Sequence, residues 1–284
     1  MECGSAIQAR RCRYGVPVTF DRKSVMSIAV GIVLYLFVPP FYFPTSHSPR
    51  SVVMTSQPQL LAQPRVETRS LLRNVYLYML LAMTVTAGVS WFTLNSGLVR
   101  SLGSPWILFG IFIVQLILVG TLAFALPKLS VPVAFAIFFA YAAVTGFTLS
   151  SIFLYYDVAD LTMAFISAAA LFLTMSLVGV FTKADLTKMG TYLFIGLIGI
   201  IIAMLINIFL RSSMMDLVIS IIGVIIFTGL TAHDTQKIMQ MSRDPRVQGS
   251  EGALMTKLSI MGALSLYLDF LNLFLFLLRI FGRD

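Results

Sequence analysis

Seven apolar segments, each about twenty residues long, dominate the pattern of hydrophobic and polar positions along the chain. They lie near residues 75–94, 105–127, 132–154, 159–181, 189–210, 215–234 and 260–279. A bilayer core of about 30 Å is crossed by roughly 20 helical residues, so each segment is predicted to be a transmembrane helix. The breaks between them are short and carry turn residues or charges. The pattern therefore predicts an all-α membrane protein, a single bundle of seven transmembrane helices without a separate soluble domain.

The composition agrees with a membrane protein. Of the 284 residues, 58% are hydrophobic and 11% are charged, whereas soluble domains are nearer about 45–50% apolar and about 25% charged. The net charge of +8 requires no nucleic-acid partner, because basic residues gather in the cytoplasmic loops of membrane proteins. Both cysteines, Cys3 and Cys12, precede the apolar segments. No disulfide framework or cysteine metal site is therefore expected in the main domain.

The distribution of Lys and Arg predicts the orientation of the bundle. If the N-terminus is cytoplasmic, ten basic residues lie on the inner side and four on the outer side. The inner residues are Arg65, Arg69, Arg73, Lys128, Lys183, Lys188, Lys237, Arg243, Arg246 and Lys257, and the outer ones are Arg100, Arg211, Arg279 and Arg283. This bias favours a cytoplasmic N-terminus and a C-terminus outside.

Residues 1–64 have a different character from the rest of the chain. Several arginines precede an apolar run, residues 25–38, that Pro39 and Pro40 interrupt. That run is short for a span and is followed by no small-residue cleavage site, so it makes a poorly formed signal peptide. Alternatively, Met54 is the true start, which leaves 231 residues that open with a polar leader. We favour this second interpretation, with residues 1–64 as a doubtful or disordered extension and 65–284 as the membrane domain.

Small residues within the spans predict where helices approach closely. Gly146 lies in the third apolar segment, and Gly196 and Gly199 lie in the fifth. Because a small side chain lets two backbones come together, such residues are typical of helix contacts in membranes.

Few strongly polar residues fall inside the predicted spans. They are Gln115, Asn207, His233, Asp234, Asp269 and Asn272. A charged group in the bilayer core costs at least about 2.5–3.5 kcal/mol, so charged residues there are candidates for function. Asp269 has about ten residues of apolar helix on either side, which puts it near the middle of the membrane. The structural alternative is a hydrogen bond within the helix, for example through Asn272.

The stretch "GLTAHDTQKI" ends the sixth apolar segment with two adjacent ionisable residues, His233 and Asp234. Lys237 follows three residues later, so an interfacial ion pair with Asp234 is the structural alternative to a functional acid. Neighbouring residues point about 100° apart on a helix, so His233 is expected to face away from Asp234 as an interface residue. Gln115 and Asn207 are predicted to make hydrogen bonds between helices.

Asp234 and Asp269 together suggest a function that neither acid suggests alone. The sixth and seventh spans are consecutive and antiparallel, so Asp234 and Asp269 are expected to face each other. Two carboxylates that meet away from water do not both ionise easily and therefore share a proton. Such a pair would be a pH-responsive latch between two helices. Its deprotonated oxygens suit a hard cation such as Ca²⁺.

Four stretches resemble the bacterial branch of the Bax inhibitor-1 family: "GFTLSSIFLYY", "FTKADLTKMGTYLFIGLIGIIIAMLINIFL", "HDTQKI" and "ALSLYLDFLNLFLFLLRIFG". The similarity covers about residues 65–284. It implies a seven-helix bundle with a central C-terminal helix in the bacterial cytoplasmic membrane, working as a pH-sensitive calcium leak channel. The paired aspartates of that family fall on Asp234 and Asp269.

The chain departs from the family in its second span, where relatives carry an acid and an arginine that helps to hold the latch. Here Gln115 lies in that span, and only Lys128, at its end, could replace the arginine. Lysine is a point charge without the bidentate fork of arginine, so the exchange is not conservative. We therefore treat Lys128, Gln115, Asn272 and His233 as supporting residues, beside Asp234 and Asp269 as the pH-sensing dyad and a transient Ca²⁺ site.

Two other classes of function are compatible with part of this pattern. An intramembrane aspartyl protease also uses two aspartates, but its second aspartate follows Gly-x-Gly, whereas residues 266–268 are Leu-Tyr-Leu, and its Pro-Ala-Leu motif is absent. A regulatory membrane protein would bind a quality-control protease or another membrane partner through its cytoplasmic loops, without ion transport. Motifs of phosphate-binding, dinucleotide-binding and zinc enzymes are lacking. We therefore expect no enzyme and no resident cofactor, with the bilayer, calcium and a membrane protein as partners.

Overall fold

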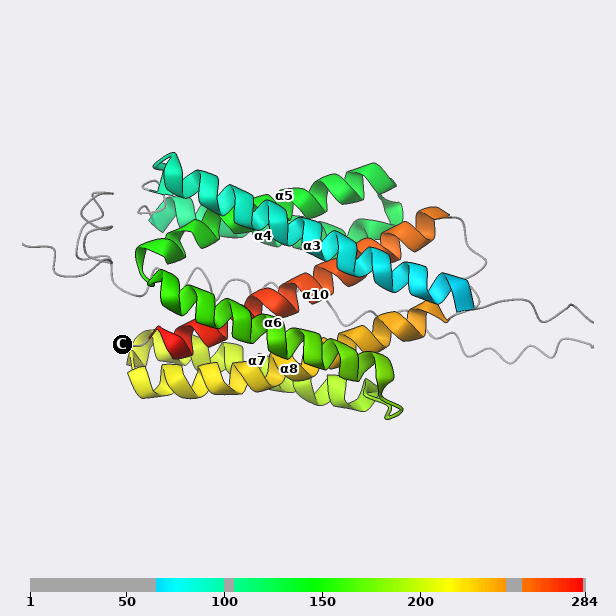
Figure 1. Ribbon diagram of the computed structural model, residues 1–284. Coiled ribbons are helices and arrows are strands. Elements are labelled where there is room, and N and C mark those ends of the chain that lie inside the picture. Colours follow the sequence, from blue (N-terminus) through cyan, green and yellow to red (C-terminus); the bar gives the residue numbers. More distant parts are fainter. Residues whose placement is uncertain (1–64, 100–104, 244–251, 283–284) are drawn as a thin grey trace, which may run out of the picture.

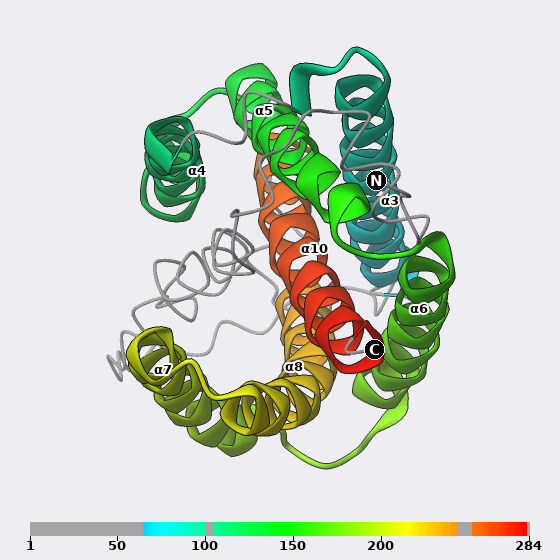
Figure 2. The same cartoon turned by 90° about the vertical axis from the view of Figure 1, so that its left-hand side faces the viewer.

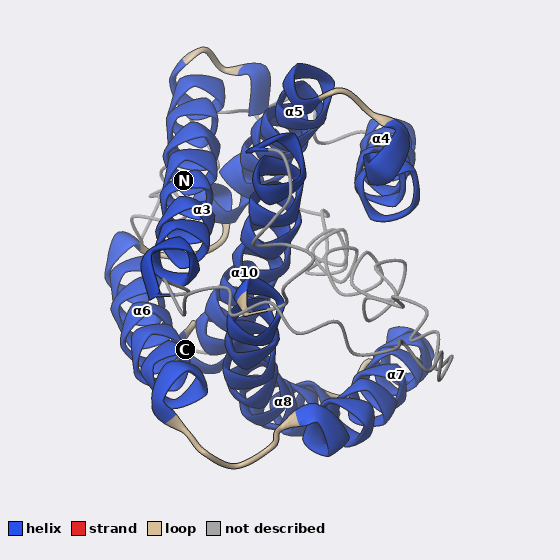
Figure 3. Ribbon diagram, turned by 90° about the vertical axis from the view of Figure 1, so that its right-hand side faces the viewer, coloured by secondary structure: helices blue, strands red, loops and turns tan. Residues whose placement is uncertain are grey.

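The computed structural model describes residues 65–99, 105–243 and 252–282. Within these ranges every regular element is a helix (Figures 1 and 3). The long helices are α3 (Arg65–Asn95), α4 (Pro105–Ala125), α5 (Val131–Leu149), α6 (Val158–Phe181), α7 (Thr187–Leu210), α8 (Ser213–Ser242) and α10 (Gly252–Phe281), and two 3₁₀ helices are η3 (Leu126–Lys128) and η4 (Ser150–Leu154). The interpretation of residues 1–64, with the proposed start at Met54, lies outside the described residues, as do Arg100, Arg246 and Arg283.

All seven long helices are long and apolar enough to cross a membrane. The prediction of an all-α bundle of seven transmembrane helices is thus confirmed. The two last helices, however, are longer than their apolar segments, since α8 continues to Ser242 and α10 begins at Gly252. Hydropathy detects where a chain can cross a bilayer, whereas the backbone hydrogen bonds of a helix continue into polar sequence. As a result, Asp234 lies well inside α8 and not at its end.

The C-terminal helix occupies the centre of the bundle, as expected. Helix α10 packs against α3, α5, α6 and α8, while α4 packs against α5 and α7 packs against α8 (Figure 2). Of the residues in the most apolar stretch of α10, 89% are buried, compared with 22% in the corresponding stretches of α4 and α7. Polar side chains of a membrane span face the interior of the bundle, because contact with lipid is costly for them. The central place of α10 accordingly keeps Ser259, Asp269 and Asn272 buried and away from lipid.

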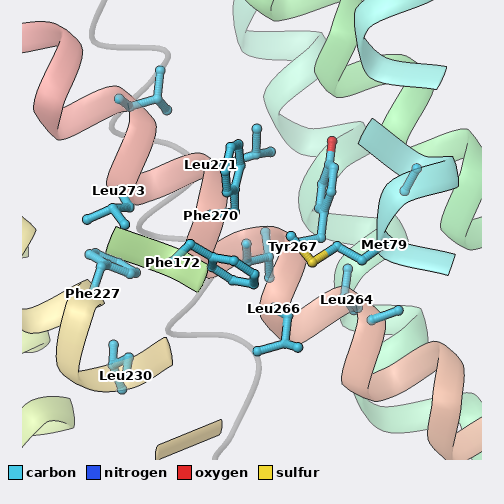
Figure 4. Close-up of a cluster of buried hydrophobic side chains, with 14 of the residues drawn as sticks. Met79, Phe172, Phe227, Leu230, Leu264, Leu266, Tyr267, Phe270, Leu271 and Leu273 are labelled. Carbon is cyan, nitrogen blue, oxygen red and sulfur yellow. The ribbon is translucent and has the colours of Figure 1, made fainter. Parts of the chain in front are cut away.

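Aromatic side chains fill the space between α10 and its neighbours (Figure 4). The ring of Phe270 meets Phe172 of α6 edge to face, with centroids 5.7 Å apart. On another side of α10, Tyr267 meets Tyr141 of α5 at 6.1 Å in the same geometry. These edge-to-face arrangements are the favourable ones for aromatic pairs.

Glycines let the helix backbones approach at several crossings. A Cβ added at Gly146 would overlap the carbonyl oxygen of Thr86, which lies on α3. A Cβ at Gly196 would lie 2.8 Å from the side chain of Ile226 on α8. Both predicted contacts are therefore confirmed. The prediction for Gly199 was wrong, because nothing lies within 4 Å of the place of its Cβ; its spacing from Gly196 turns it about 60° to the open side of α7.

The connection between α7 and α8 corrects one predicted role. Arg211 ends α7 in the left-handed conformation, with φ of 54°. The backbone N–H of Ser212 then donates to Oδ1 of Asn207 at 3.0 Å. Asn207 was expected to bond to another helix, but its side chain instead closes the turn that follows its own helix. Short amide side chains near a helix end often bond to local backbone in this way.

Candidate functional site

Helices α8 and α10 lie antiparallel, and their contacts define which residues face each other. The hydroxyl of Ser265 on α10 donates a short hydrogen bond to Oδ2 of Asp234 on α8. Farther along, the ring of Phe276 covers Gly223, where a Cβ would come within 2.7 Å of the ring atoms. The two contacts fit one register, since eleven residues separate the partners on each helix. Asp234 is thus level with Ser265.

Asp269 lies one helical turn beyond Ser265 on the same face of α10. In the register of the two helices it is level with Leu230, four residues before Asp234, and therefore about 6 Å along the bundle from the level of Asp234. Asp269 is fully buried, with 0% exposure, and Asp234 is 8% exposed. The two predicted acids thus lie on the facing sides of α8 and α10, one turn apart in level.

His233 also contacts the carboxyl group of Asp234. Its Nδ1 lies 2.9 Å from Oδ1 of Asp234, and its ring packs over Gly190 on α7, where a Cβ would overlap it. The prediction that His233 faces away from Asp234 was wrong. Side-chain rotation brings the two groups together despite the angle between their Cα–Cβ bonds, and the bare backbone of Gly190 leaves room for the ring.

The next two residues reach two further parts of the bundle. Thr235 faces α6 at Gly179, where a Cβ would lie 2.9 Å from Cβ of Thr235. Gln236 contacts the loop between α6 and α7. Residues 233–236, which we call the HDTQ turn, therefore contact α7, α10, α6 and this loop in succession. Because four consecutive residues cover a full turn, each points to a different neighbour.

Charged groups surround the HDTQ turn. Lys237 follows it on α8 and acts electrostatically on Asp234. Asp185, in the loop between α6 and α7, accepts a hydrogen bond at 2.9 Å from the backbone N–H of Thr187. Hydrogen bonds from Thr187 hold the pKa of Asp185 below its ordinary value, with smaller electrostatic contributions from Lys188 and His233. Both signs of charge therefore occur at this end of the bundle.

The remaining predicted residues lie elsewhere. Gln115 is buried and donates to the hydroxyl of Thr145 on α5 at 3.4 Å, which confirms its hydrogen bond between helices. Asn272 donates to the carbonyl of Leu268 within α10 at 2.8 Å. Lys128 is exposed at the end of η3.

The level of Lys128 follows from a neighbouring contact. Nζ of Lys257, near the start of α10, donates to the carbonyl of Pro127 at 3.0 Å. Lys257 precedes Ser265 by eight residues, or about 12 Å along the helix. Lys128, next to Pro127, therefore lies at the level of the first turns of α10, and not at that of Asp234.

Two further polar contacts of α10 were missed in the sequence. The hydroxyl of Tyr267 is 2.7 Å from that of Thr86 on α3. The apolar pattern of the span does not indicate this contact. At the far end of α10, Nη1 of Arg279 lies 3.7 Å from Oδ1 of Asp216 on α8. The count of basic residues that predicts the topology does not indicate this contact. Ser265 was missed too, and its spacing of four residues from Asp269 was the signal that could have found it.

Within the described residues, no group of three or more His, Cys, Asp or Glu side chains could hold a metal ion. The candidate site is therefore a carboxyl group held between a histidine and a serine, with a second, fully buried carboxyl group one turn away. Such a site suits proton exchange and the passing contact of a cation.

Fold and site together define an integral membrane protein of seven helices, in which a buried C-terminal helix meets a polar turn of the helix before it. The sequence profile described as "Inhibitor of apoptosis-promoting Bax1" matches residues 68–284. The chain therefore belongs to the Bax inhibitor-1 family, as its sequence motifs suggested.

Similar proteins occur in several bacteria. The inner membrane protein YbhL of Escherichia coli (strain K12) is 43% identical over 225 residues, which cover 78% of this chain and 95% of YbhL. A protein of Deinococcus radiodurans is 39% identical over 234 residues, 82% of this chain and 96% of that protein. A membrane protein of Streptococcus pyogenes serotype M3 is 46% identical over 180 residues, 63% of this chain and 76% of that protein.

Proposed function

We propose that this protein is a pH-sensitive leak channel for cations, with calcium as the permeant ion, and that Asp234 and Asp269 form its gate. The observation that carries the proposal is the hydrogen bond between Asp234 of α8 and Ser265 of α10, one turn from the fully buried Asp269. The central helix is thereby joined to its neighbour at an ionisable group, the arrangement that a proton-operated gate requires.

The physical basis is the cost of charge in a buried place. Two carboxyl groups at neighbouring levels are coupled, because a negative charge on one opposes the ionisation of the other. A change in proton occupancy alters the charge between α8 and α10, and with it the preferred distance between these helices. The direction in which pH opens the gate is left to the experiment.

Calcium is a reasonable permeant ion because the facing groups are oxygen ligands. Hard divalent cations prefer carboxylate and other oxygen atoms and bind tightly when six to eight of them converge. Asp234 and Asp269 supply carboxylates, and Ser265 supplies a hydroxyl. A set this small favours passage over permanent binding, so the proposal includes no resident metal or other cofactor and no enzymatic reaction.

The proposed location is the bacterial cytoplasmic membrane, with the bilayer as the surroundings of the outward-facing apolar side chains. The name of the E. coli relative, an inner membrane protein, supports this location. The excess of Lys and Arg on one side of the predicted topology supports a cytoplasmic N-terminus and a C-terminus outside.

A second candidate is a regulatory membrane protein that binds a membrane quality-control protease or another membrane protein without transporting ions. The observation in its favour is the loop between α6 and α7, where Lys183 and Asp185 are exposed on a backbone that Gln236 holds in place. A loop of fixed shape is a suitable contact surface for a partner.

Calcium flux from proteoliposomes between about pH 5 and pH 8 tests the proposal. The wild-type protein should give a flux that depends on pH, and Asp269→Asn should abolish this dependence because one titrating group is lost. Asp160→Asn, the same substitution in the first turn of α6, is the matched control. A pH dependence that persists in Asp269→Asn would refute the gate. Absence of wild-type flux at every pH would refute the channel and favour the second candidate.

A further inference from the structure

The side chain of Gln236 links α8 to the loop between α6 and α7, residues 182–186. Its Oε1 accepts a hydrogen bond from the backbone N–H of Leu186 at 2.8 Å. Its Nε2 donates to the carbonyl of Ala184 at 2.7 Å. Gln236 is itself buried, at 8% exposure. Both ends of one amide are thus used on the backbone of one loop, which lies fifty residues away in the sequence.

The loop depends on this contact because its own side chains satisfy other backbone groups. The hydroxyl of Thr182 accepts from the N–H of Ala184 at 3.2 Å, and Asp185 accepts from the N–H of Thr187 at 2.9 Å. The carbonyl of Ala184 and the N–H of Leu186 are bonded from outside, by Gln236. These two backbone groups of the loop are thus held by a side chain of another helix.

Gln236 also lies close to the candidate gate at Asp234. It follows Asp234 by two residues in the HDTQ turn, within the continuous helix α8. The helical backbone transmits a rotation or shift of one residue to the next, since its geometry is set by the hydrogen bonds of the same turn. A movement of α8 that separates Asp234 from Ser265 therefore also moves Gln236 relative to the loop.

We propose that Gln236 is a positioning residue that couples the loop of residues 182–186 to the contact between Asp234 and Ser265. The loop caps this end of the bundle while the contact is made, and it is released when α8 and α10 separate. Coupling of this kind is reciprocal, so a molecule that binds the loop shifts the contact as well. The inference deepens the proposed gate, but its test needs no ion flux.

The charged groups near Asp234 come from α8, α10, α7 and the loop between α6 and α7, while Thr235 faces Gly179 on α6. They are His233 and Lys237 on α8, Asp269 on α10, Asp185 in the loop and Lys188 on α7. Experiments are therefore compared at one fixed pH, so that a change of pH acting on these groups does not add to the difference between variants.

Hydrogen–deuterium exchange of the full chain in lipid nanodiscs, followed for the backbone amides of residues 182–188, tests the first half of the proposal. Gln236→Ala removes two hydrogen bonds, each of which is expected to slow amide exchange of the loop by a factor on the order of five. Exchange of the loop should therefore rise roughly 10- to 30-fold. Gln240→Ala, at an exposed position one turn further along α8, should leave it unchanged. Equal exchange in Gln236→Ala and the wild type would overturn the proposal.

A variant on α10 tests the coupling itself. Ser265→Ala removes the donor to Asp234 without altering the loop itself. Loop exchange should nevertheless rise by roughly two- to fivefold, because only part of the effect of losing this one hydrogen bond reaches the loop. Ser265→Thr retains a hydroxyl and should restore the wild-type rate. The control is Ser259→Ala, because the hydroxyl of Ser259 bonds to its own helix at the carbonyl of Met255.

The outcomes separate this inference from the proposed channel. If Gln236→Ala loosens the loop while Ser265→Ala does not, Gln236 is only a local anchor and the coupling is refuted. If both variants loosen the loop while the wild-type protein carries no calcium, the coupling stands and the channel is refuted.

Discussion

Replacement of Gly190 by alanine should destabilise the protein through a clash with His233. The new Cβ would overlap the imidazole ring and lie 2.7 Å from its Cε1 atom. Both groups are held by rigid helices, α7 and α8, so the ring must leave its place over Gly190. Its contact with Asp234, now 2.9 Å between Nδ1 and Oδ1, should be lost with it.

Gly199→Ala on the same helix provides the reference for the magnitude. Alanine favours a helix over glycine by about 0.5–1 kcal/mol at either position, but nothing lies within 4 Å of the place of the Cβ at Gly199. The difference between the two variants therefore isolates the clash. Overpacking in a filled interior costs about 1–3 kcal/mol, so Gly190→Ala should be less stable than Gly199→Ala by that amount.

Reversible unfolding in a defined detergent or bicelle measures this difference, and a double-mutant cycle assigns it to His233. In the His233→Ala background the ring is absent, and Gly190→Ala should then be as stable as Gly199→Ala. Equal stability of the two glycine variants in the presence of His233 would refute the packing of the ring. A penalty that survives His233→Ala would show that another part of α8 causes the clash.

Three further predictions follow from the other contacts. Asp234→Asn, Asp269→Asn and the double variant should all give calcium flux without pH dependence, with the double variant resembling each single one because the two acids act as a unit. Tyr267→Phe removes the hydroxyl bonded to Thr86 and should lower the free energy of unfolding by about 0.6 kcal/mol, at most about 1.7, without changing the pH profile of flux. A cysteine at Arg243 should react with an impermeant reagent only from the cytoplasmic side, and exclusive labelling from outside would invert the predicted topology.

The seven helices could be predicted because they follow from hydropathy, whereas the central place of α10 was implied only by the resemblance to the Bax inhibitor-1 family. A run of about twenty apolar residues can satisfy its backbone in a bilayer only as a helix. Hydropathy does not identify the central helix, because α10 carries Asp269 and is less apolar than α4 and α7, whose spans are far less buried. The helix ends could not be predicted in this way, because Ser242 and Gly252 lie in polar sequence that carries no bilayer signal.

The positions of the two acids could be predicted because a buried charge is rare in an apolar span, but their partners could not. Ser265 and His233 contact Asp234 through a register and a side-chain rotation that depend on three helices at once. The role of Gln236 was harder still to predict, because its partners are backbone atoms of a loop fifty residues away. A pattern along one helix indicates which face is polar, whereas the group it meets is decided by the packing of others.

The two links between α8 and α10 differ in a way that bears on how the helices separate. Near one end Asp234 meets Ser265, both of them largely covered, while near the other Arg279 meets Asp216, which is 45% exposed. Asp216 and Asp234 are eighteen residues apart, or about 27 Å along α8. The guanidinium of Arg279 keeps its charge at any physiological pH and also lies over the ring of Phe276 at 5.7 Å. A change in the charge of Asp234 therefore acts on one end of α8, about 27 Å from the end where the charged Arg279 contacts Asp216 and Phe276.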